Sequence, residues 1–335
     1  MNTWGRNLKL TIWGESHGPG LGAVLEGIGP GFEIDWDAVD RDMARRAPGS
    51  DDLATPRKET DSVEILSGIF QGRATGAPIC ALIRNENARS GDYTPNIPRP
   101  GHADYPSYVK YKGHGDYRGG GRFSGRLTAP LVWAGAIAKQ VLTKRYSVEI
   151  TARAALIHGE GGASAQREAI LAAKAGGDSV GGVIECVAAG VPPGAGEPFF
   201  GSLESEIAAL LFSVPGVKGV EFGDGFPMAA MYGSQANDAM EARDGNIELR
   251  SNHNGGILGG ISNGQPIVVR AAVKPTPSIA KEQTTVDLDT VQTISHSVKG
   301  RHDPCIVPRA VPVAEACVAL ALLDALMDTD KEAQP

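Results

Sequence analysis

The chain has 335 residues, 41% of them hydrophobic and 21% charged, a balance typical of a folded globular protein with one large domain or two ordinary ones. Its formal net charge of −7 argues against a nucleic acid or a membrane surface as the main partner. The four cysteines are widely spaced without a C-x-x-C pair, which argues against a disulfide or zinc framework and favours a reducing, cytoplasmic location. The first ten residues contain no apolar signal-peptide core.

Taken in chain order, β-branched and alternating runs predict strands, and amphipathic runs predict helices. The predicted strands cover residues 8–13, 63–70, 79–84, 181–189, 217–222 and 266–273. The predicted helices cover residues 36–46, 128–145, 164–175, 202–213 and 312–328. The last helix is the most apolar, but Glu315 and Asp324 within it argue against a membrane span. Because there is no regular βαβ alternation, repeat or shift in composition, the pattern predicts a single α/β body.

Residues 14–18 read GESHG and match G-x-S-x-G, the nucleophile elbow of α/β-hydrolases, with a predicted strand in front of it. An elbow needs a helix directly after the serine, but glycines at 18, 20 and 22 and a proline at 19 disfavour a helix. Residues 23–31, AVLEGIGPG, instead predict another short strand and a turn. A serine hydrolase with Ser16 as nucleophile is therefore an alternative that the motif supports and the following residues oppose.

Glycine-rich and arginine-rich stretches lie between the predicted elements, and several long loops of this kind suggest a site assembled from loops. They are residues 45–49, 99–105, 117–130, 252–266, 274–279 and 300–316. Their basic residues include Arg45, Arg46, Arg99, Arg118, Arg122, Arg126, Lys274, Arg301 and Arg309. Because arginine pairs bidentately with carboxylate or phosphate and glycine lets backbone N–H groups approach an anion, the set predicts a multiply anionic small ligand. Any one of these arginines can equally be an ordinary surface residue.

The most promising ionisable side chains are two histidines and one aspartate. His17 lies in GESHG and His102 in PGHAD; nearby anions would favour a protonated imidazole, so both are candidate general acids, with a structural hydrogen bond as the alternative. Asp303 precedes Pro304, which restricts its conformation, and it is either a fixed functional carboxylate or a turn residue. Cys305 is expected to be a small buried residue. The sequence has no H-E-x-x-H motif or Cys/His cluster, which argues against a metal site.

Several motifs, in this order, resemble chorismate synthase: GESHG, RPGHADY, DYRGGGR, SNHNGGILGGISNGQPI, KPTPSI and GRHDPCIVPRAVPVAEA. The resemblance extends from about residue 5 to residue 328. It implies an α/β (α+β) fold, a β-α-β sandwich with helices packed between sheets rather than a Rossmann fold, with one domain at 1–330 and a tail at 331–335. It also implies a homotetrameric lyase of aromatic amino acid biosynthesis. That enzyme eliminates phosphate from 5-enolpyruvylshikimate 3-phosphate in a 1,4-anti reaction and yields chorismate, with reduced FMN as cofactor.

The same resemblance implies roles for individual residues. His17 would protonate the departing phosphate, His102 would lie against the flavin ring, and Asp303 would relay the proton removed from the substrate. Substrate contacts would be Ser16, Arg45, Arg46 and Arg309, and Arg46 would also contact NADPH. FMN contacts would be Arg122, Ser124, Gln235, Ala236, Gly259, Lys274, Pro275, Thr276, Pro277, Ser278 and Arg301.

Some positions depart from the pattern common in that family. They are Trp13, Asp52, Gly115, Phe123, Gly125 and Leu127. Phe123 stands in place of a serine beside the expected FMN contact Ser124, and Asp52 and Gly115 each stand where arginine is common. These departures keep open a second hypothesis, a diverged binding protein that holds FMN or a phosphorylated acid without turnover. The sequence also leaves open whether NADPH on the enzyme or an external flavin reductase would reduce the FMN.

Overall fold

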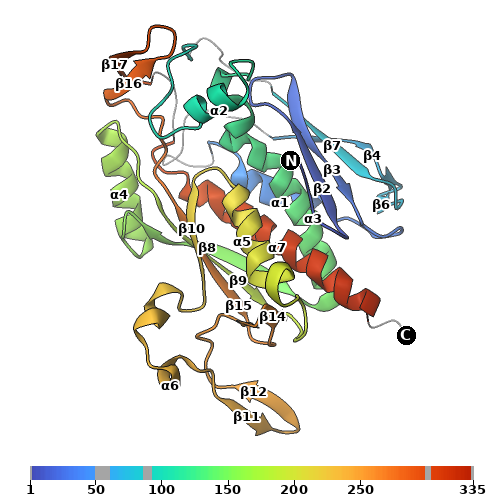
Figure 1. Cartoon of the computed structure of the whole chain (residues 1–335). Helices are drawn as coiled ribbons and strands as arrows, with labels where there is room; N and C mark the ends of the chain where they lie inside the picture. Colours follow the sequence, from blue (N-terminus) through green and yellow to red (C-terminus); the bar gives the residue numbers. More distant parts are fainter. Residues whose placement is uncertain (1, 50–60, 86–92, 299–302, 333–335) are drawn as a thin grey trace.

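The computed structural model describes residues 2–49, 61–85, 93–298 and 303–332. Within them, a layer of helices lies between two antiparallel sheets (Figure 1). Every strand pair in the described ranges is antiparallel, whereas a Rossmann fold is built on a mostly parallel sheet. The predicted α/β (α+β) class and the β-α-β sandwich are therefore confirmed.

The first sheet is built from the N-terminal part of the chain and has the strand order β1-β2-β3-β7-β4. Its strands are β1 (Thr3–Trp4), β2 (Lys9–Gly14), β3 (Gly20–Glu26), β4 (Val63–Ser67) and β7 (Ile79–Arg84). Alternate residues of β7, Ile79, Ala81 and Ile83, are buried and the residues between them are less so, as expected for a strand with one face on the core. The turn between β2 and β3 carries the GESHG motif.

The second sheet has the order β10-β15-β9-β8. Its strands are β8 (Glu149–Ile157), β9 (Gly182–Ala189), β10 (Val217–Phe222) and β15 (Ile267–Val273). The burial of β15 alternates in the same way, with Ile267, Val269 and Ala271 buried. Each sheet therefore presents one apolar face to the helices between them.

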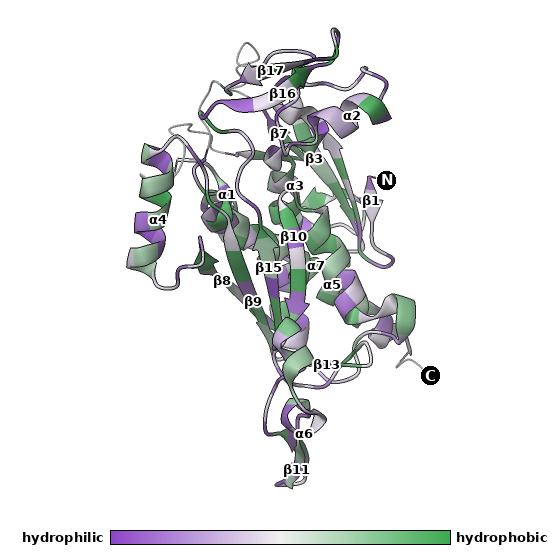
Figure 2. Cartoon of the chain, turned by 60° about the vertical axis from the view of Figure 1, so that its left-hand side comes forward, coloured by the Kyte–Doolittle hydropathy of each residue, from purple (hydrophilic) through white to green (hydrophobic). Residues whose placement is uncertain are grey.

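The helical layer consists mainly of α1 (Trp36–Arg46), α3 (Thr128–Tyr146), α5 (Leu203–Ser213) and α7 (Val307–Glu332). Helix α3 packs on α7 and on strands β2 and β3, whereas α7 packs on β8 and β9. Both helices are hydrophobic along most of their length (Figure 2), because each has neighbours on both sides. By length and composition α7 could cross a membrane, but 89% of its apolar window is buried inside the protein.

Charged side chains within α7 are paired rather than isolated. Asp324 accepts hydrogen bonds from the backbone N–H groups of Asn7 and Leu8 at 2.7 and 2.8 Å. Glu315 accepts from Arg45 at 2.7 Å and from Lys139 at 2.9 Å. These partners satisfy carboxylates that would otherwise be costly to bury, and they tie α7 to the N-terminal strands, α1 and α3.

Smaller elements surround this framework. The remaining helices are α2 (Asp104–Lys110), α4 (Ala163–Ala175), α6 (Gly233–Ala236), η2 (Arg118–Phe123), η3 (Gly125–Leu127), η4 (Phe199–Gly201) and η5 (Phe226–Ala230). The remaining strands form the hairpins β5–β6 (Ile69–Phe70, Arg73–Ala74), β11–β12 (Met240–Arg243, Asn246–Leu249), β13–β14 (Ile257–Leu258, Ile261–Ser262) and β16–β17 (Gln283–Asp287, Gln292–His296). Helix α6 and β11–β12 project from the end of the molecule opposite to α2 and β16–β17 (Figure 1).

The predicted elements are largely confirmed. The helix at 36–46 is correct at both ends, and the other predicted helices and strands overlap observed ones. Several details differ: residues 63–70 are divided into β4 and β5, and α7 begins at Val307 rather than 312. Strand β8, helix α2 and the hairpins β11–β12 and β16–β17 were not predicted. Pro308 is tolerated in the first turn of α7, because a backbone N–H at that position would have no partner within the helix. Burial of Val307, Val311 and Val313 stabilises the helix around Pro312.

The crossing of α3 and α7 is close enough to require glycine at one position. A Cβ added at Gly135 would overlap the side chain and backbone of Ala316. We expect Gly135→Ala to lower the free energy of unfolding by about 1–3 kcal/mol or more, because neither helix backbone can yield easily. Gly29→Ala, where an added Cβ meets open space, is the matched control for the entropic effect of removing a glycine. Urea denaturation of both variants measures the difference, and equal midpoints would contradict this account.

Candidate active site

A cavity of about 680 Å³ opens where loops from both halves of the chain meet. The predicted glycine-rich and arginine-rich stretches supply much of its wall, with the segment between α5 and β10. Its lining comes from residues 99–106, 119–128, 212–218, 274–278 and 303–313, with Arg46, Pro48 and Tyr93. The first turns of α3 and α7 and the last turn of α1 therefore all reach this cavity, and the loops that were predicted to form a site meet there.

Three consecutive glycines shape one wall of the cavity. Gly119, Gly120 and Gly121 all have positive φ, at 61°, 81° and 48°. A Cβ at Gly119 would overlap the imidazole of His17, and a Cβ at Gly120 would lie 2.7 Å from the ring of His102. Glycine is therefore needed here both for the backbone conformation and for the close approach of two rings. The loop brings together two histidines that lie 85 positions apart in the sequence.

His17 lies just behind this wall. Its ring contacts Gly119 and stacks edge-on against Tyr93 at a centroid distance of 5.3 Å, and both of these neighbours line the cavity. Ser16 is only 2% exposed, and its Oγ lies 3.1 Å from His17 Nδ1 and within reach of the carbonyls of residues 118 and 119. Strand β3, not a helix, follows the motif. The nucleophile elbow of a serine hydrolase is therefore absent from this turn.

His102 lines the cavity directly, in the loop before α2. Asp104 lies 2.6 Å from its Nδ1, and Arg99 donates hydrogen bonds to the same carboxylate. Arg99 also donates to Ser278 Oγ at 3.0 Å. Asp104 was not predicted as a site residue, and Arg99 was predicted only as one of the basic loop residues that would bind an anionic ligand, although both belong to the motif RPGHADY that pointed to His102.

Two arginines of the cavity share one buried carboxylate. Arg46 donates to Asp61 at 2.9 Å, and Arg126 forms a second ion pair with it. Arg46 also donates to Thr128 Oγ1 and to the Gly125 carbonyl, at 3.1 and 2.8 Å. Burial lowers the pKa of Arg46 to about 10, so it stays cationic at neutral pH. Burial opposes ionisation of Asp61, but the two arginines outweigh it and hold its pKa below the usual value. The group carries a net positive charge beside the cavity.

The opposite wall combines the start of α7 with the loop after β15. Asp303 forms an ion pair with Arg309, which also donates to the Arg46 carbonyl at 3.0 Å. Lys274 donates to the Gly101 carbonyl, and burial together with nearby Lys218 lowers its pKa. Cys305, beside Asp303, is buried, which confirms the expectation for it.

The chain was compared with known proteins. The profile of the family described as chorismate synthase matches residues 8–327. Chorismate synthase of Archaeoglobus fulgidus is 48% identical, with 98% of this chain and 97% of that protein covered. That of Korarchaeum cryptofilum is 46% identical, with 97% of each covered. A crystal structure of chorismate synthase superimposes with a TM-score of 0.76 at 30% identity, covering 97% of this chain and 93% of that one.

The chain belongs to the chorismate synthase family. The resemblance stated from the motifs is thereby confirmed over nearly the whole chain. The chorismate synthase of known structure shares the layered fold, and several of the motifs of this family line the cavity.

The cavity residues fit the FMN that the chorismate synthase motifs imply. Arg122, Ser124 and the five residues from Lys274 to Ser278 all line it. Among the described residues, Thr276 Oγ1 is a buried polar atom without a hydrogen-bond partner, and such atoms normally have one. A phosphate or hydroxyl group of a ligand would satisfy it. Ser124 meanwhile caps the next turn through the Arg126 N–H at 3.3 Å.

The structure does not bring every predicted residue to this cavity. Arg45 lies apart from it, with its guanidinium on Glu315 and Asp42. Gln235 and Ala236 lie in α6, on the projecting end of the molecule, and Gly259 lies in the turn between β13 and β14 (Figure 1). None of these four lines the cavity. Arg301 and the departure Asp52 lie outside the described residues.

Two of the departures from the chorismate synthase pattern, Phe123 and Gly125, line the cavity. Phe123 lines the cavity, and its ring lies 6.2 Å from that of Tyr111. Gly125 also lines it and offers its carbonyl to Arg46. A side chain at Gly115 would approach Ser107 and Tyr111, so arginine at that position would compete for the space around the Tyr111–Phe123 pair.

Asp61 provides a test of the electrostatic arrangement. Its folded pKa is lowered, so its stabilisation is complete above the unfolded pKa of roughly 3.9 and is lost as the pH falls through the lower folded value. We expect Asp61→Asn to cost about 3–5 kcal/mol near pH 7, because two buried arginines lose their counter-charge. The difference from the unmodified protein should shrink as the pH falls below roughly 4. Urea denaturation across that pH range measures it, and a difference independent of pH would refute the charge argument.

Proposed function

We propose that this protein is a chorismate synthase that eliminates phosphate from 5-enolpyruvylshikimate 3-phosphate in the described cavity, with reduced FMN as its cofactor. The observation that carries the proposal is the arrangement of His17 and His102 on neighbouring glycines of one loop, at the wall of an arginine-rich cavity. Family membership supports the reaction, and this geometry supports the place where it occurs.

The charge of the cavity suits the substrate. The substrate carries one phosphate and two carboxylates, and guanidinium groups bind both kinds of anion. The cationic residues that line the cavity are Arg46, Arg99, Arg122, Arg126, Lys218, Lys274 and Arg309. Among the described residues, Asp303 is the one carboxylate in the cavity lining. The cationic side chains of the lining therefore outnumber its carboxylates.

The histidines and Asp303 would divide the proton transfers between them. His17, oriented by Ser16 Oγ at 3.1 Å, would donate a proton to the departing phosphate. Asp303 would accept the proton that leaves the substrate ring, held in place by its ion pair with Arg309. His102 would face the cofactor. Reduced FMN, when bound, supplies electron density to the breaking C–O bond, and the walls around it exclude water.

The proposed reaction needs FMN in its reduced form, and two sources of electrons are possible. NADPH would bind beside Arg46, or an external flavin reductase would deliver reduced FMN. All three nitrogens of the Arg46 guanidinium donate hydrogen bonds within the protein. These bonds fix the side chain in place, which favours a role as a fixed positive charge near the anionic ligands. We further propose that residues 1–330 act as one domain and that the enzyme works in the cytoplasm.

The positions of Gln235 and Ala236 support an assembled enzyme. Helix α6 lies at the far end of the molecule from α2 (Figure 1), so its residues can contact FMN only in the cavity of another copy. Large apolar side chains are exposed on this end, as an interface requires. They are Phe226, Tyr232, Met240 and Ile247, with exposed fractions of 83%, 79%, 65% and 76%. A homotetramer would cover them and complete each site.

Substitution of the site residues tests the proposed chemistry. His17→Ala and His102→Ala should each lower the rate of phosphate release by about 10²–10⁴-fold, the usual contribution of a positioned acid–base group. FMN binding should persist in both. Phosphate release is measured anaerobically with photoreduced FMN, and again with NADPH in place of photoreduction. His158→Ala, at an exposed turn after β8, is the control.

The same assay separates the alternatives. If the unmodified protein binds FMN but releases no phosphate, the departures at Phe123, Gly125 and Leu127 have produced a binding protein and the enzyme is refuted. If either histidine variant keeps nearly full turnover, the role given to that histidine is wrong.

Mixing of inactive variants tests the shared site. Gln235→Ala and Lys274→Ala should each lose activity alone, because each removes a proposed FMN contact. When the two variants are co-expressed with different tags and purified together, roughly one quarter of the sites should receive both intact residues if these come from different copies. Activity should therefore return in the mixed assembly. If exchange is verified and no activity returns, Gln235 does not contribute to a neighbouring cavity.

A further inference from the structure

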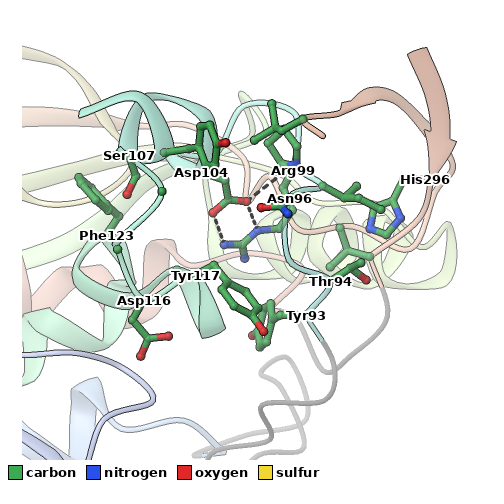
Figure 3. A pocket seen from close by; sticks show the side chains of 18 residues that line it. Tyr93, Thr94, Asn96, Arg99, Asp104, Ser107, Asp116, Tyr117, Phe123 and His296 are labelled. Atoms are coloured by element: carbon green, nitrogen blue, oxygen red, sulfur yellow. Dashed lines mark hydrogen bonds and ion pairs between the residues drawn. The ribbon is translucent and has the colours of Figure 1, made fainter. Parts of the chain in front are cut away.

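Asp104 lies directly behind His102 as seen from the cavity. It is the first residue of α2, and its carboxylate Oδ1 is 2.6 Å from His102 Nδ1. Both side chains are mostly buried, with exposed fractions of 18% and 14%. Figure 3 shows the Asp104 carboxylate facing the guanidinium of Arg99.

The carboxylate of Asp104 is saturated with donors. Arg99 donates to it from the backbone N–H at 3.0 Å and from Nε and Nη2 at 2.7 and 2.9 Å. His102 adds a further bond. Burial works against ionisation, but the hydrogen bonds from Arg99 and His102 outweigh it and hold the pKa of Asp104 well below its usual range. Asp104 is therefore a carboxylate at neutral pH and can only accept hydrogen bonds.

This contact determines which nitrogen of His102 carries a proton. An atom 2.6 Å from an ionised carboxylate oxygen must be a donor, so Nδ1 of His102 is protonated. Arg99 Nη2 also lies 3.0 Å from Nδ1. The guanidinium and a protonated Nδ1 are both donors, so this contact is not a hydrogen bond, and the shorter contact with Asp104 determines the protonation of Nδ1. Nε2 is then the nitrogen that can accept, and Arg99 Nη2 approaches it at 3.3 Å.

Charged groups from several elements face His102. Asp104 favours the imidazolium form, whereas Arg99 on the same loop disfavours it. Lys274, whose Nζ donates to the Gly101 carbonyl, approaches from the loop after β15. Across the cavity, Asp303 and Arg309 form a compensated pair at the start of α7. Among these, Asp104 is the anion in direct contact with the ring, so its loss should remove the preference for the Nδ1–H form.

Arg99 extends this arrangement to the proposed cofactor wall. Its Nη1 donates to Ser278 Oγ, which is buried, at 3.0 Å. His102, Asp104, Arg99 and Ser278 thus form a continuous hydrogen-bonded chain from the imidazole to the loop of residues 274–278. The orientation of the ring is coupled to the position of that loop.

We propose that Asp104 is a positioning residue that fixes His102 in its Nδ1–H form, leaves Nε2 as the acceptor beside Arg99 Nη2, and, through Arg99, holds the ring in register with Ser278. The consequence for catalysis rests on the proposed function, because it requires His102 to act in the reaction. The arrangement of hydrogen bonds does not.

The test is ¹⁵N NMR of the full-length protein labelled at histidine nitrogens, without added ligand. In the unmodified protein, His102 should show the Nδ1–H tautomer when neutral. In Asp104→Asn it should show mixed or Nε2–H signals, whereas Asp104→Glu should restore part of the original pattern. His102→Ala assigns the signals. Asp224→Asn is the matched control, because Asp224 makes the same 2.6 Å bond to His253 Nδ1; it should change only His253.

Turnover distinguishes this inference from the proposed function. Asp104→Asn should lower the rate at least about tenfold, as loss of an orienting carboxylate does elsewhere. Asp104→Asn should add nothing in the His102→Ala background. If His102 signals are unchanged in Asp104→Asn, the inference fails whatever the rate. If they change and the rate does not, the inference stands and the role given to His102 fails.

Discussion

Burial of two helices between two sheets is the constraint on which the site depends. Helix α3 follows directly after the glycine loop, and α7 begins four residues after Asp303. Because both helices are hydrophobic on nearly all sides, they must lie in the central layer. Their first turns then open on the same cavity, and the loops that precede them are brought together there. The contact of Gly135 with Ala316 shows how tightly this crossing is set.

Buried charge is organised on two sides of this helical layer. On one side Glu315 and Asp42 together neutralise Arg45 and Lys139, and neither cation lines the cavity. On the other side Asp61 holds Arg46 and Arg126 against the cavity wall. The same residue types are thus structural in one cluster and suited to anion binding in the other. The difference is the access of the guanidinium groups to the cavity.

Local patterns predicted the helices and most strands well, because amphipathic periodicity and capping are encoded within ten to twenty residues. The helix at 36–46 was correct at both ends, whereas the start of α7 was missed because burial of its valines overrides the propensity of Pro312. Among the site residues, His102 and the loop 274–278 line the cavity as the motifs suggested. Arg45 adjoins Arg46 in sequence, yet it points to Glu315, since neighbours on a helix face different directions.

The sequence by itself determined the family, the layered fold and the loops that carry the chemistry, because these are written in contiguous motifs and in hydrophobic periodicity. Only the tertiary structure decided that Gly119 leaves room for the ring of His17 and Gly120 for the ring of His102. It also decided that Asp104 stands behind one of them and that Asp61 joins two arginines. These contacts join residues of different elements or depend on side-chain direction. Their formation follows from how α3 and α7 pack between the sheets, which no local pattern records.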